Sequence, residues 1–305
     1  MKGDVGMNGW LIVNKVLKTA KFIELQEWLL NSAKSNNINL IVYDNTAFVS
    51  EEEIEEKIAN DKPSFVLFWD KDIPLARRLE KKGLRLFNSA TAIEICDSKI
   101  VTYTELLSSG ICMPKTVIIP MVYGFSDWEV ENEFIGKTEQ YLGFPMIAKE
   151  SKGSFGKQVY MLNNHEELLS CLKEHANSPM LLQEYIASSH GKDIRVQVVG
   201  GKVVATMKRF SKTDFRANIT NGGSMAKYEL TVAQEEMAVR VCELLKLDFA
   251  GVDILFGVND EPILCEVNSN AHFINLYQCT GINCADKIVE YIKNEVTNYE
   301  SLADL

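Results

Sequence analysis

Three oxygen-bearing side chains near the C-terminus, those of Asp253, Glu266 and Asn268, are of the types that bind a hard divalent cation. They lie in two aliphatic runs, residues 251–257 and 263–269, with a short Asn-Asp turn between them, and this pattern predicts an antiparallel hairpin. A turn centred on that dipeptide pairs Asp253 with Glu266 and places Asn268 on the same face. Two carboxylates whose Cβ atoms are about 5 Å apart repel each other unless a cation lies between them. The hairpin therefore predicts a Mg²⁺ site, with Mn²⁺ as an alternative ion.

The register of this hairpin also assigns its other side chains to faces. It predicts that Leu255 lies opposite Leu264 on the metal face. The other face then carries core residues, namely Val252, Ile254, Phe256, Cys265 and Val267.

A second hairpin is predicted around Gly200 and Gly201, because two glycines supply the positive φ angles of a tight turn. Pairing about these glycines places on one face Asp193, Arg195, Gln197, Thr206 and Lys208. The other face carries Ile194, Val196, Val198, Val203, Ala205 and Met207. An aligned arginine and lysine in an acidic protein suit a clamp on phosphoryl oxygens, and plain solvent exposure is the alternative.

A glycine-rich segment, residues 151–157, joins two predicted strands. Its spacing differs from that of a P-loop, but Gly153 and Gly156 allow the backbone to approach a triphosphate closely. A mobile surface turn is the alternative. Lys149 is the sole charge in the strand before this segment, where a lysine either reaches solvent or meets a phosphate. Lys99 is less informative, because a solvated lysine at a helix end explains it equally well.

The segment from Lys208 to Gly223 contains Arg209, Arg216 and Asn218 but few apolar residues. A loop of this length inside a compact domain is usually functional or disordered. The four histidines show neither the spacing of a catalytic triad nor that of a zinc site, and His272 alone is a candidate for a substrate pocket.

The elements that position these residues begin with an alternation of strand and helix. Strands are predicted at residues 10–13, 40–43, 65–68 and 84–87, and helices at 20–33, 51–60 and 75–82. This βα alternation predicts a mostly parallel sheet with helices on both faces. No G-x-G-x-x-G motif follows the first strand, so a dinucleotide site is not supported there.

The pattern changes after residue 95 to that of α+β units. We predict three domains: an N-terminal βαβ domain at 1–95, a central subdomain with a Gly-rich lid loop at 96–187, and a C-terminal subdomain with the metal site at 188–305.

The bulk composition limits the classes of function. A chain of 305 residues with a net charge of −10 is not expected to bind nucleic acid or anionic membranes. No apolar run approaches the roughly 20 residues that span a bilayer, and the N-terminus lacks the pattern of a signal peptide. Seven scattered cysteines without a C-x-x-C motif favour reduced thiols and a cytoplasmic location.

Taken in order, these segments resemble the ATP-grasp superfamily, and most closely its RimK-like carboxylate–amine ligases. The resemblance extends from about residue 90 to the C-terminus, roughly two thirds of the chain. It is carried by Asp97-Ser-Lys99, Gly110 to Thr116, Ile147-Ala-Lys149, Gly153-Ser-Phe-Gly156, Gln183-Glu-Tyr-Ile186, Gly191-Lys-Asp-Ile-Arg195, Asp214-Phe-Arg-Ala-Asn218, Gly251-Val-Asp-Ile-Leu255 and Glu266-Val-Asn-Ser269.

The resemblance implies an ATP-grasp fold, in which an α/β N-terminal domain precedes two α+β subdomains that clasp ATP. It implies that the residues that contact ATP are Lys99, Lys149, Gly153, Ser154, Gly156, Gln183, Glu184, Tyr185, Ile186, Asp193, Lys208, Arg216 and Asn218, with Asp193 on the ribose. It also implies Mg²⁺ on Asp253, Glu266 and Asn268. Arg195 and Arg209 are then the candidates that stabilise charge during catalysis.

Such ligases phosphorylate a carboxylate with ATP, and an amine then attacks the acyl phosphate to form an amide. We therefore expect an ADP-forming acid–amino-acid ligase that acts on small-molecule or peptide carboxylates and amines, and a homo-dimer or homo-tetramer. Many relatives continue with Pro-Gly after Ser269, whereas this chain has Asn270 to Phe273. Because that segment borders the acceptor pocket in the family, Asn270 and His272 are substrate-pocket candidates, and the substrate itself is not predicted. A small-molecule kinase and a non-catalytic nucleotide-binding regulator are the alternatives.

Overall fold

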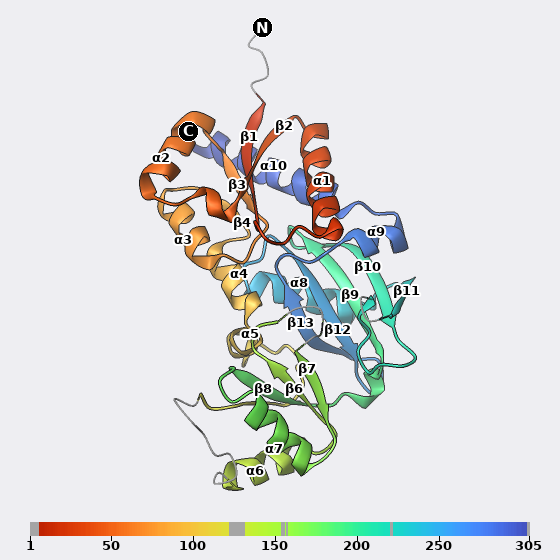
Figure 1. The fold of residues 1–305 in the computed structure, drawn as a ribbon. Coiled ribbons are helices and arrows are strands. Elements are labelled where there is room, and N and C mark those ends of the chain that lie inside the picture. Colours follow the sequence, from red (N-terminus) through yellow and green to blue (C-terminus); the bar gives the residue numbers. More distant parts are fainter. Residues whose placement is uncertain (1–5, 122–131, 154–155, 157, 220–221, 304–305) are drawn as a thin grey trace.

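The computed structural model of the chain describes residues 6–121, 132–153, 156, 158–219 and 222–303. Within these ranges the strands form three sheets, which follow one another down the long axis of the molecule (Figure 1). No helix in this part of the chain is both long and apolar enough to cross a bilayer.

The first sheet is parallel and has the strand order β2-β1-β3-β4. Its strands are β1 (Met7–Val13), β2 (Ile38–Asp44), β3 (Phe65–Phe68) and β4 (Leu86–Phe87). The helices around it are α1 (Ala20–Ser35), α2 (Glu51–Asp61), α3 (Ile73–Lys81) and α4 (Ala90–Asp97), with a 3₁₀ turn η1 (Asn45–Ala47). Side chains of Ser50 and Asp72 cap α2 and α3, because each accepts a hydrogen bond from a backbone N–H of the first turn. The predicted parallel βα unit is confirmed.

The other two sheets are antiparallel. One has the order β5-β8-β6-β7 and contains β5 (Thr116–Ile118), β6 (Met146–Glu150), β7 (Val159–Leu162) and β8 (Met180–Glu184). The other has the order β11-β10-β9-β12-β13 and contains β9 (Lys192–Val199), β10 (Lys202–Phe210), β11 (Ser224–Lys227), β12 (Phe249–Phe256) and β13 (Pro262–Asn268). The remaining helices are α5 (Lys99–Leu106), α6 (Asn132–Leu142), α7 (His165–Glu174), η2 (Ala187–Ser189), α8 (Val232–Leu244), α9 (Ile274–Thr280) and α10 (Cys284–Ala303).

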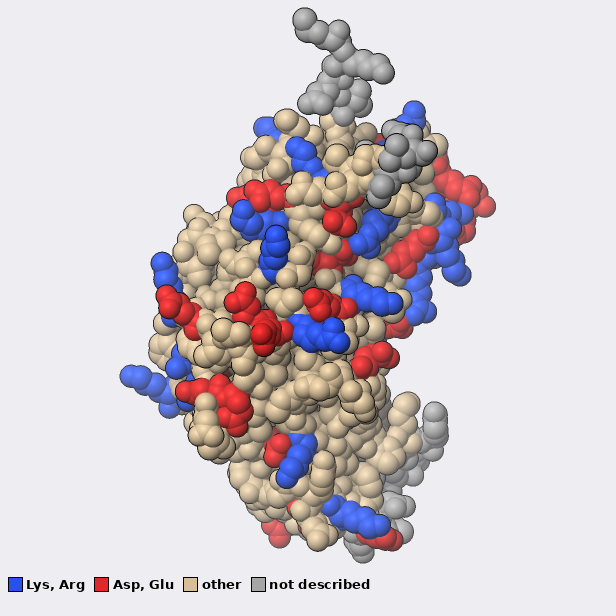
Figure 2. All heavy atoms as spheres, turned by 180° about the vertical axis from the view of Figure 1, so that it is seen from behind, with Lys and Arg blue, Asp and Glu red and all other residues tan. Residues whose placement is uncertain are grey.

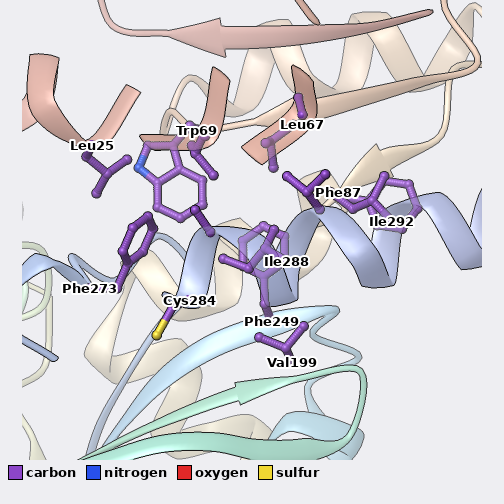
Figure 3. Close-up of a cluster of buried hydrophobic side chains, with 14 of the residues drawn as sticks. Leu25, Leu67, Trp69, Phe87, Val199, Phe249, Phe273, Cys284, Ile288 and Ile292 are labelled. Atoms are coloured by element: carbon purple, nitrogen blue, oxygen red, sulfur yellow. The ribbon is translucent and has the colours of Figure 1, made fainter. Parts of the chain in front are cut away.

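The C-terminal helix α10 returns to the N-terminal sheet. Its Ile288 and Ile292 lie in one buried cluster with Leu25 of α1, Leu67 of β3 and Phe249 of β12 (Figure 3). The N-terminal sheet and the C-terminal helix therefore pack in one core, which also includes Phe249 of the antiparallel sheet that contains β12. The domain limits at residues 95 and 187 stay a prediction, but α10 packs with the first of the predicted domains rather than only with the third.

The metal hairpin forms with a bulge that the sequence did not indicate. Asp253 pairs with Glu266 as predicted, but the register shifts at once, so that Ile254 pairs with Leu264. The predicted Leu255–Leu264 pair is wrong, because the extra residue in β13 turns Leu264 into the core and leaves Cys265 toward the cavity described below.

A second irregularity lies in the β9–β10 hairpin, between Val203 and Ala205. Beyond it Met207 pairs with Arg195, and Arg209 pairs with Asp193. A slip of one residue moves every following side chain to the other face, so the predicted faces for residues 205–208 are wrong. Lys208 lies over the ring of Phe256, 5.1 Å from its centroid, and Arg209 takes the position beside Asp193.

The surface seen from behind carries acidic and basic side chains that are interspersed rather than separated by sign (Figure 2). An example of an exposed ion pair is that of Lys82 with Glu55, at 2.6 Å, in which the Glu55 side chain is 64% exposed. Such pairs contribute little to stability.

Asn88 is fully buried and joins the N-terminal sheet to the antiparallel one. Its Nδ2 donates to the carbonyl oxygens of Phe249 (2.9 Å) and Ser269 (3.1 Å), and its Oδ1 accepts from the backbone N–H of Asp248 (2.6 Å). Asn88→Ala leaves these backbone groups without partners, and we expect it to lower the free energy of unfolding by about 2–3 kcal/mol. Urea unfolding measures this. Asn39→Ala is the control, because Asn39 is exposed and its side chain bonds the side chain of Asn8. It should change the free energy of unfolding little.

Candidate active site

One cavity of about 520 Å³ lies where the three sheets meet. Its lining contains nearly all of the residues that the sequence singled out: Lys99, Lys149, Gly153, Gly156, Gln183, Glu184, Tyr185, Ile186, Asp193, Arg195, Arg209, Arg216, Asn218, Asp253, Glu266, Asn268, Asn270 and His272. Lys208 is not in this lining, because the register shift in β10 places it on the other face of the sheet. Ser154 lies outside the described residues.

A buried network of two arginines and two aspartates forms the floor of the cavity. Arg209 donates from Nε and Nη2 to the two carboxylate oxygens of Asp193, both at 2.7 Å, and its Nη2 lies 3.0 Å from Oδ2 of Asp253. Arg195 donates to both oxygens of Asp253, from Nε to Oδ1 and from Nη2 to Oδ2 (2.8 Å). Cross-strand pairing between β9, β10 and β12 produces this alternation of charge.

The network sets the ionisation of Asp253. Burial alone would raise its pKa, but the charges of Arg195 and Arg209 outweigh burial and hold the pKa below its usual value. Burial likewise opposes the charge on Arg209, and Asp193 and Asp253 more than offset it, so the pKa of Arg209 is raised. Two guanidinium groups thus balance Asp253 without a metal, which the argument from carboxylate repulsion did not anticipate.

The proposed metal ligands still fit a hard cation. Each carboxylate oxygen can accept two hydrogen bonds. Both arginines contact Oδ2 of Asp253, whereas Oδ1 accepts from Nε of Arg195 and can accept one further ligand. Glu266 is paired across the hairpin, and its Oε1 lies 3.9 Å from Nζ of Lys99. Within the described residues no three His, Cys, Asp or Glu side chains gather as a metal cluster. The candidate set is therefore two carboxylates and the amide oxygen of Asn268, all oxygen donors suited to Mg²⁺.

Two lysines face the cavity near these ligands. Nζ of Lys99 lies 3.3 Å from the carbonyl oxygen of Gly153, and Nζ of Lys149 lies 4.0 Å from Sγ of Cys265. Burial is the main cause that lowers the pKa of Lys99, and Glu266 opposes this shift. Half-buried ammonium groups with so few anionic partners are suited to bind an anionic ligand.

The glycine-rich segment contacts the loop after β10. Nη1 of Arg216 donates to the carbonyl oxygen of Gly156 at 2.6 Å, and Arg216 also pairs with Asp214 at 2.8 Å. Gly156 has a φ of +70°, which favours glycine, and a Cβ there would make a tight contact of 3.0 Å with Oδ1 of Asn218. Two segments about 60 residues apart are thereby joined over the cavity.

The end of β8 lies at the cavity edge. Gln183 donates from Nε2 to the hydroxyl of Thr116 at 3.0 Å, and the carboxylate of Glu184 accepts from the backbone N–H of Lys115 at 2.8 Å. Tyr185 bonds His190 through its hydroxyl. The side chains of Gln183, Glu184 and Tyr185 thus have protein partners, and residues 183–186 line the cavity.

No individual site residue was predicted in the N-terminal domain. Asn14, Lys21, Phe22, Asp70 and Lys71 all line the cavity. Asn14 follows β1, and Asp70 follows β3 by two residues. Since ligands of open parallel sheets bind beyond the carboxyl ends of the strands, the positions directly after the predicted strands were the signal that could have found them.

His272 packs edge-to-face on Phe22, with ring centroids 4.6 Å apart. Burial, together with the charges of Lys21 and Arg195, lowers its pKa to about 4. A histidine whose pKa is lower in the folded chain than in the unfolded chain destabilises the fold as the pH falls through this interval, because the unfolded chain binds the proton more tightly. Between pH 7 and pH 5 the free energy of unfolding should fall in both proteins. We expect the fall to be about 2 kcal/mol larger in the unmodified chain than in His272→Phe. Urea unfolding at the two pH values measures this, and equal losses would contradict it.

The fold and the site together define an ATP-grasp architecture, in which antiparallel subdomains enclose a cation-rich cavity behind a parallel sheet. The chain belongs to the RimK-like ATP-grasp family, whose domain matches residues 96–292. It is 34% identical over 235 residues to N-acetylaspartylglutamate synthase A of Homo sapiens, covering 76% of this chain and 58% of that protein. Over 226 residues it is 34% identical to beta-citrylglutamate synthase B of Danio rerio, covering 73% of this chain and 54% of that protein. The chain therefore spans little more than half the length of these two relatives.

A bacterial relative, a probable alpha-L-glutamate ligase of Legionella pneumophila, is 34% identical over 224 residues, with 72% of this chain and 70% of that protein covered. Among solved structures, D-alanine–D-alanine ligase from Bacillus anthracis complexed with ATP matches with a TM-score of 0.72 at 17% identity, covering 97% of this chain and 99% of that chain. A RimK domain ATP-grasp protein from Sphaerobacter thermophilus matches with a TM-score of 0.68 at 16% identity, covering 93% and 98%. These two structures confirm the predicted fold.

Proposed function

We propose that this protein is an ATP- and Mg²⁺-dependent ligase that joins a carboxylate to the amino group of an amino acid. The observation that carries the proposal is that a single cavity combines cationic groups for phosphate with oxygen ligands for a divalent ion. Family membership supports the same reaction class, because relatives of this chain carry the names of synthases and ligases.

The proposed reaction proceeds in two steps. ATP transfers its γ-phosphoryl group to the carboxylate, and the amine then attacks the acyl phosphate, so that the C–N bond forms as phosphate leaves. Catalysis of this kind depends on positioning and on charge neutralisation rather than on a protein nucleophile. A bound Mg²⁺ would neutralise charge on the phosphate oxygens.

We assign roles to the residues by where their side chains lie. Lys99 and Lys149 bind phosphate oxygens, and the backbone of residues 184–186 binds the adenine. Asp253, Glu266 and Asn268 hold the ion, and Arg209 keeps Asp253 ionised. Arg195, which contacts Asp253 and lines the cavity, stabilises the developing oxyanion.

The amine that we propose is L-glutamate. The names of the human, zebrafish and Legionella relatives all include glutamate. The carboxylate partner differs among those names, so N-acetyl-L-aspartate and citrate are the first acids to test. The cytoplasmic location and the homo-oligomer remain predictions from the sequence.

ADP release tests the proposal. The protein is incubated with ATP, Mg²⁺ and each acid, with and without L-glutamate, and with hydroxylamine as a trap for the acyl phosphate. We expect ADP release that depends on both acid and amine, and a hydroxamate when hydroxylamine replaces L-glutamate. A stable phosphorylated acid or alcohol without amide would identify a kinase instead, and nucleotide binding without turnover across a broad panel of acids would favour a regulator.

A further inference from the structure

A buried carboxylate outside the assigned machinery faces the same cavity. Asp70 follows β3 by two residues and is only 6% exposed. Among the described residues, no lysine, arginine or histidine forms a salt bridge with it. Lys71, its neighbour, instead directs Nζ to Asp97 at 2.7 Å. A buried charge without a counter-ion is costly, so its presence at a cavity wall calls for a ligand.

The hydrogen bonds of Asp70 leave part of the carboxylate available. Oδ1 accepts from the backbone N–H of Lys71 at 2.7 Å and from Nδ2 of Asn14 at 3.1 Å, whereas Oδ2 has only a 3.4 Å contact with the same Nδ2. All these donors are neutral. Burial raises the pKa of Asp70, and the nearby Asp72 adds to this shift, as expected of an acid that lacks a cationic partner.

A second unsatisfied acceptor lies beside it. Nδ2 of Asn270 donates to the backbone carbonyl of Asp70 at 3.0 Å, while Oδ1 of Asn270 is buried and has no hydrogen-bond partner in the described part of the chain. Buried acceptors are rarely left unpaired unless a ligand completes them. Asn270 also stands only two residues after Asn268, so this pair of acceptors adjoins the proposed reaction centre.

We propose that Asp70, with Asn14 and Asn270, forms the subsite for the primary ammonium group of the amine substrate. An ammonium group is a compact cation with several hydrogen-bond donors. It matches a carboxylate oxygen whose contact with Asn14 is long and an amide oxygen without a donor. It supplies the missing counter-ion of Asp70 and a donor for Asn270. This inference rests on the proposed ligase function and adds to it where the amine binds.

Calorimetry with L-glutamate and glutarate tests the subsite. The two molecules share both carboxylates, but glutarate lacks the amino group. The protein is saturated with Mg²⁺ and a non-hydrolysable ATP analogue, so no turnover is needed. We expect the unmodified protein to bind L-glutamate at least about 30-fold more tightly than glutarate, and Asp70→Asn to bind the two with similar affinity.

Asp72→Asn is the matched control, because it removes the same charge two residues away at a carboxylate that caps α3 and is not part of the cavity lining. It should keep the preference for L-glutamate. Asp70→Asn should keep its affinity for the nucleotide analogue and a melting temperature at or above that of the unmodified chain, since a buried uncompensated charge is removed. A purely structural role would instead lower the melting temperature.

Asn270→Ala is a second variant, and it leaves the carboxylate of Asp70 in place. It should weaken the binding of L-glutamate without changing the affinity for glutarate. An unmodified protein that binds both molecules equally, or neither, overturns the subsite, as does an Asp70→Asn variant that retains the preference. Because binding is measured without turnover, this result is separate from ADP release: a protein can show the preference and no ligation, or ligation and no preference.

Discussion

Replacement of Glu266 by glutamine is expected to lower kcat for ADP release by about 10²–10³-fold. The substitution keeps the size of the side chain but removes the negative charge of a residue that lies opposite Asp253 in the hairpin, and whose Oε1 lies 3.9 Å from Nζ of Lys99. A neutral amide oxygen is a weaker ligand for Mg²⁺ than a carboxylate, so the ion and the phosphates lose their position. The fold should be unaffected, because Glu266 is 31% exposed and its contact with Lys99 is long.

Glu261→Gln is the control for this experiment. Glu261 lies in the same hairpin, but its carboxylate accepts from the backbone of Val258 and Asn259 in the turn, away from the cavity. It should retain normal kcat. Nucleotide affinity measured without Mg²⁺ should be the same in Glu266→Gln and the unmodified protein. Near-normal turnover by Glu266→Gln would remove Glu266 from the metal site.

Replacement of Arg209 by methionine is expected to lower the free energy of unfolding by about 3–5 kcal/mol. The Arg209 side chain is 7% exposed, and its guanidinium makes two 2.7 Å hydrogen bonds to Asp193 and one 3.0 Å contact with Asp253. Methionine fills similar space but leaves Asp193 buried without a cation, while Asp253 keeps Arg195. Urea unfolding of the protein without nucleotide gives the value.

The partner substitution shows whether charge is the cause. Asp193→Asn in the Arg209→Met background removes the unpaired carboxylate, and we expect it to restore more than half of the lost stability. Arg240→Met is the matched control, because Arg240 pairs with Glu243 at 3.4 Å on a helix surface where both side chains are more than half exposed; its loss should be about 0.5 kcal/mol or less. An Arg209→Met protein as stable as the control would show that the network contributes no net stability.

Both predictions depend on pairings across the antiparallel sheet, and the sequence foresaw these only in part. The Asp253–Glu266 pair was predicted from a two-residue turn, but next to the loop Phe256 pairs with Pro262, one residue away from that register. The extra residue Cys265 in β13 then brings Asp253 opposite Glu266. The bulges at Cys265 and between Val203 and Ala205 did not follow, because nothing in the local residue pattern distinguishes a regular strand from one with an inserted residue. The shift in β10 places Arg209 rather than Lys208 beside Asp193, and Lys208 is not among the residues that line the cavity.

The sequence by itself determined the parallel βα unit, the antiparallel hairpins and the residues that carry charge, because periodicity and turn chemistry are local properties of the chain. Tertiary structure alone decided that Arg195 and Arg209 balance Asp253, that α10 packs on the first sheet, and that Asp70 and Asn14 line the same cavity as Asn270. Each of these contacts joins residues on different strands or far apart in the chain, and such contacts depend on how whole sheets pack rather than on any residue pattern within one segment.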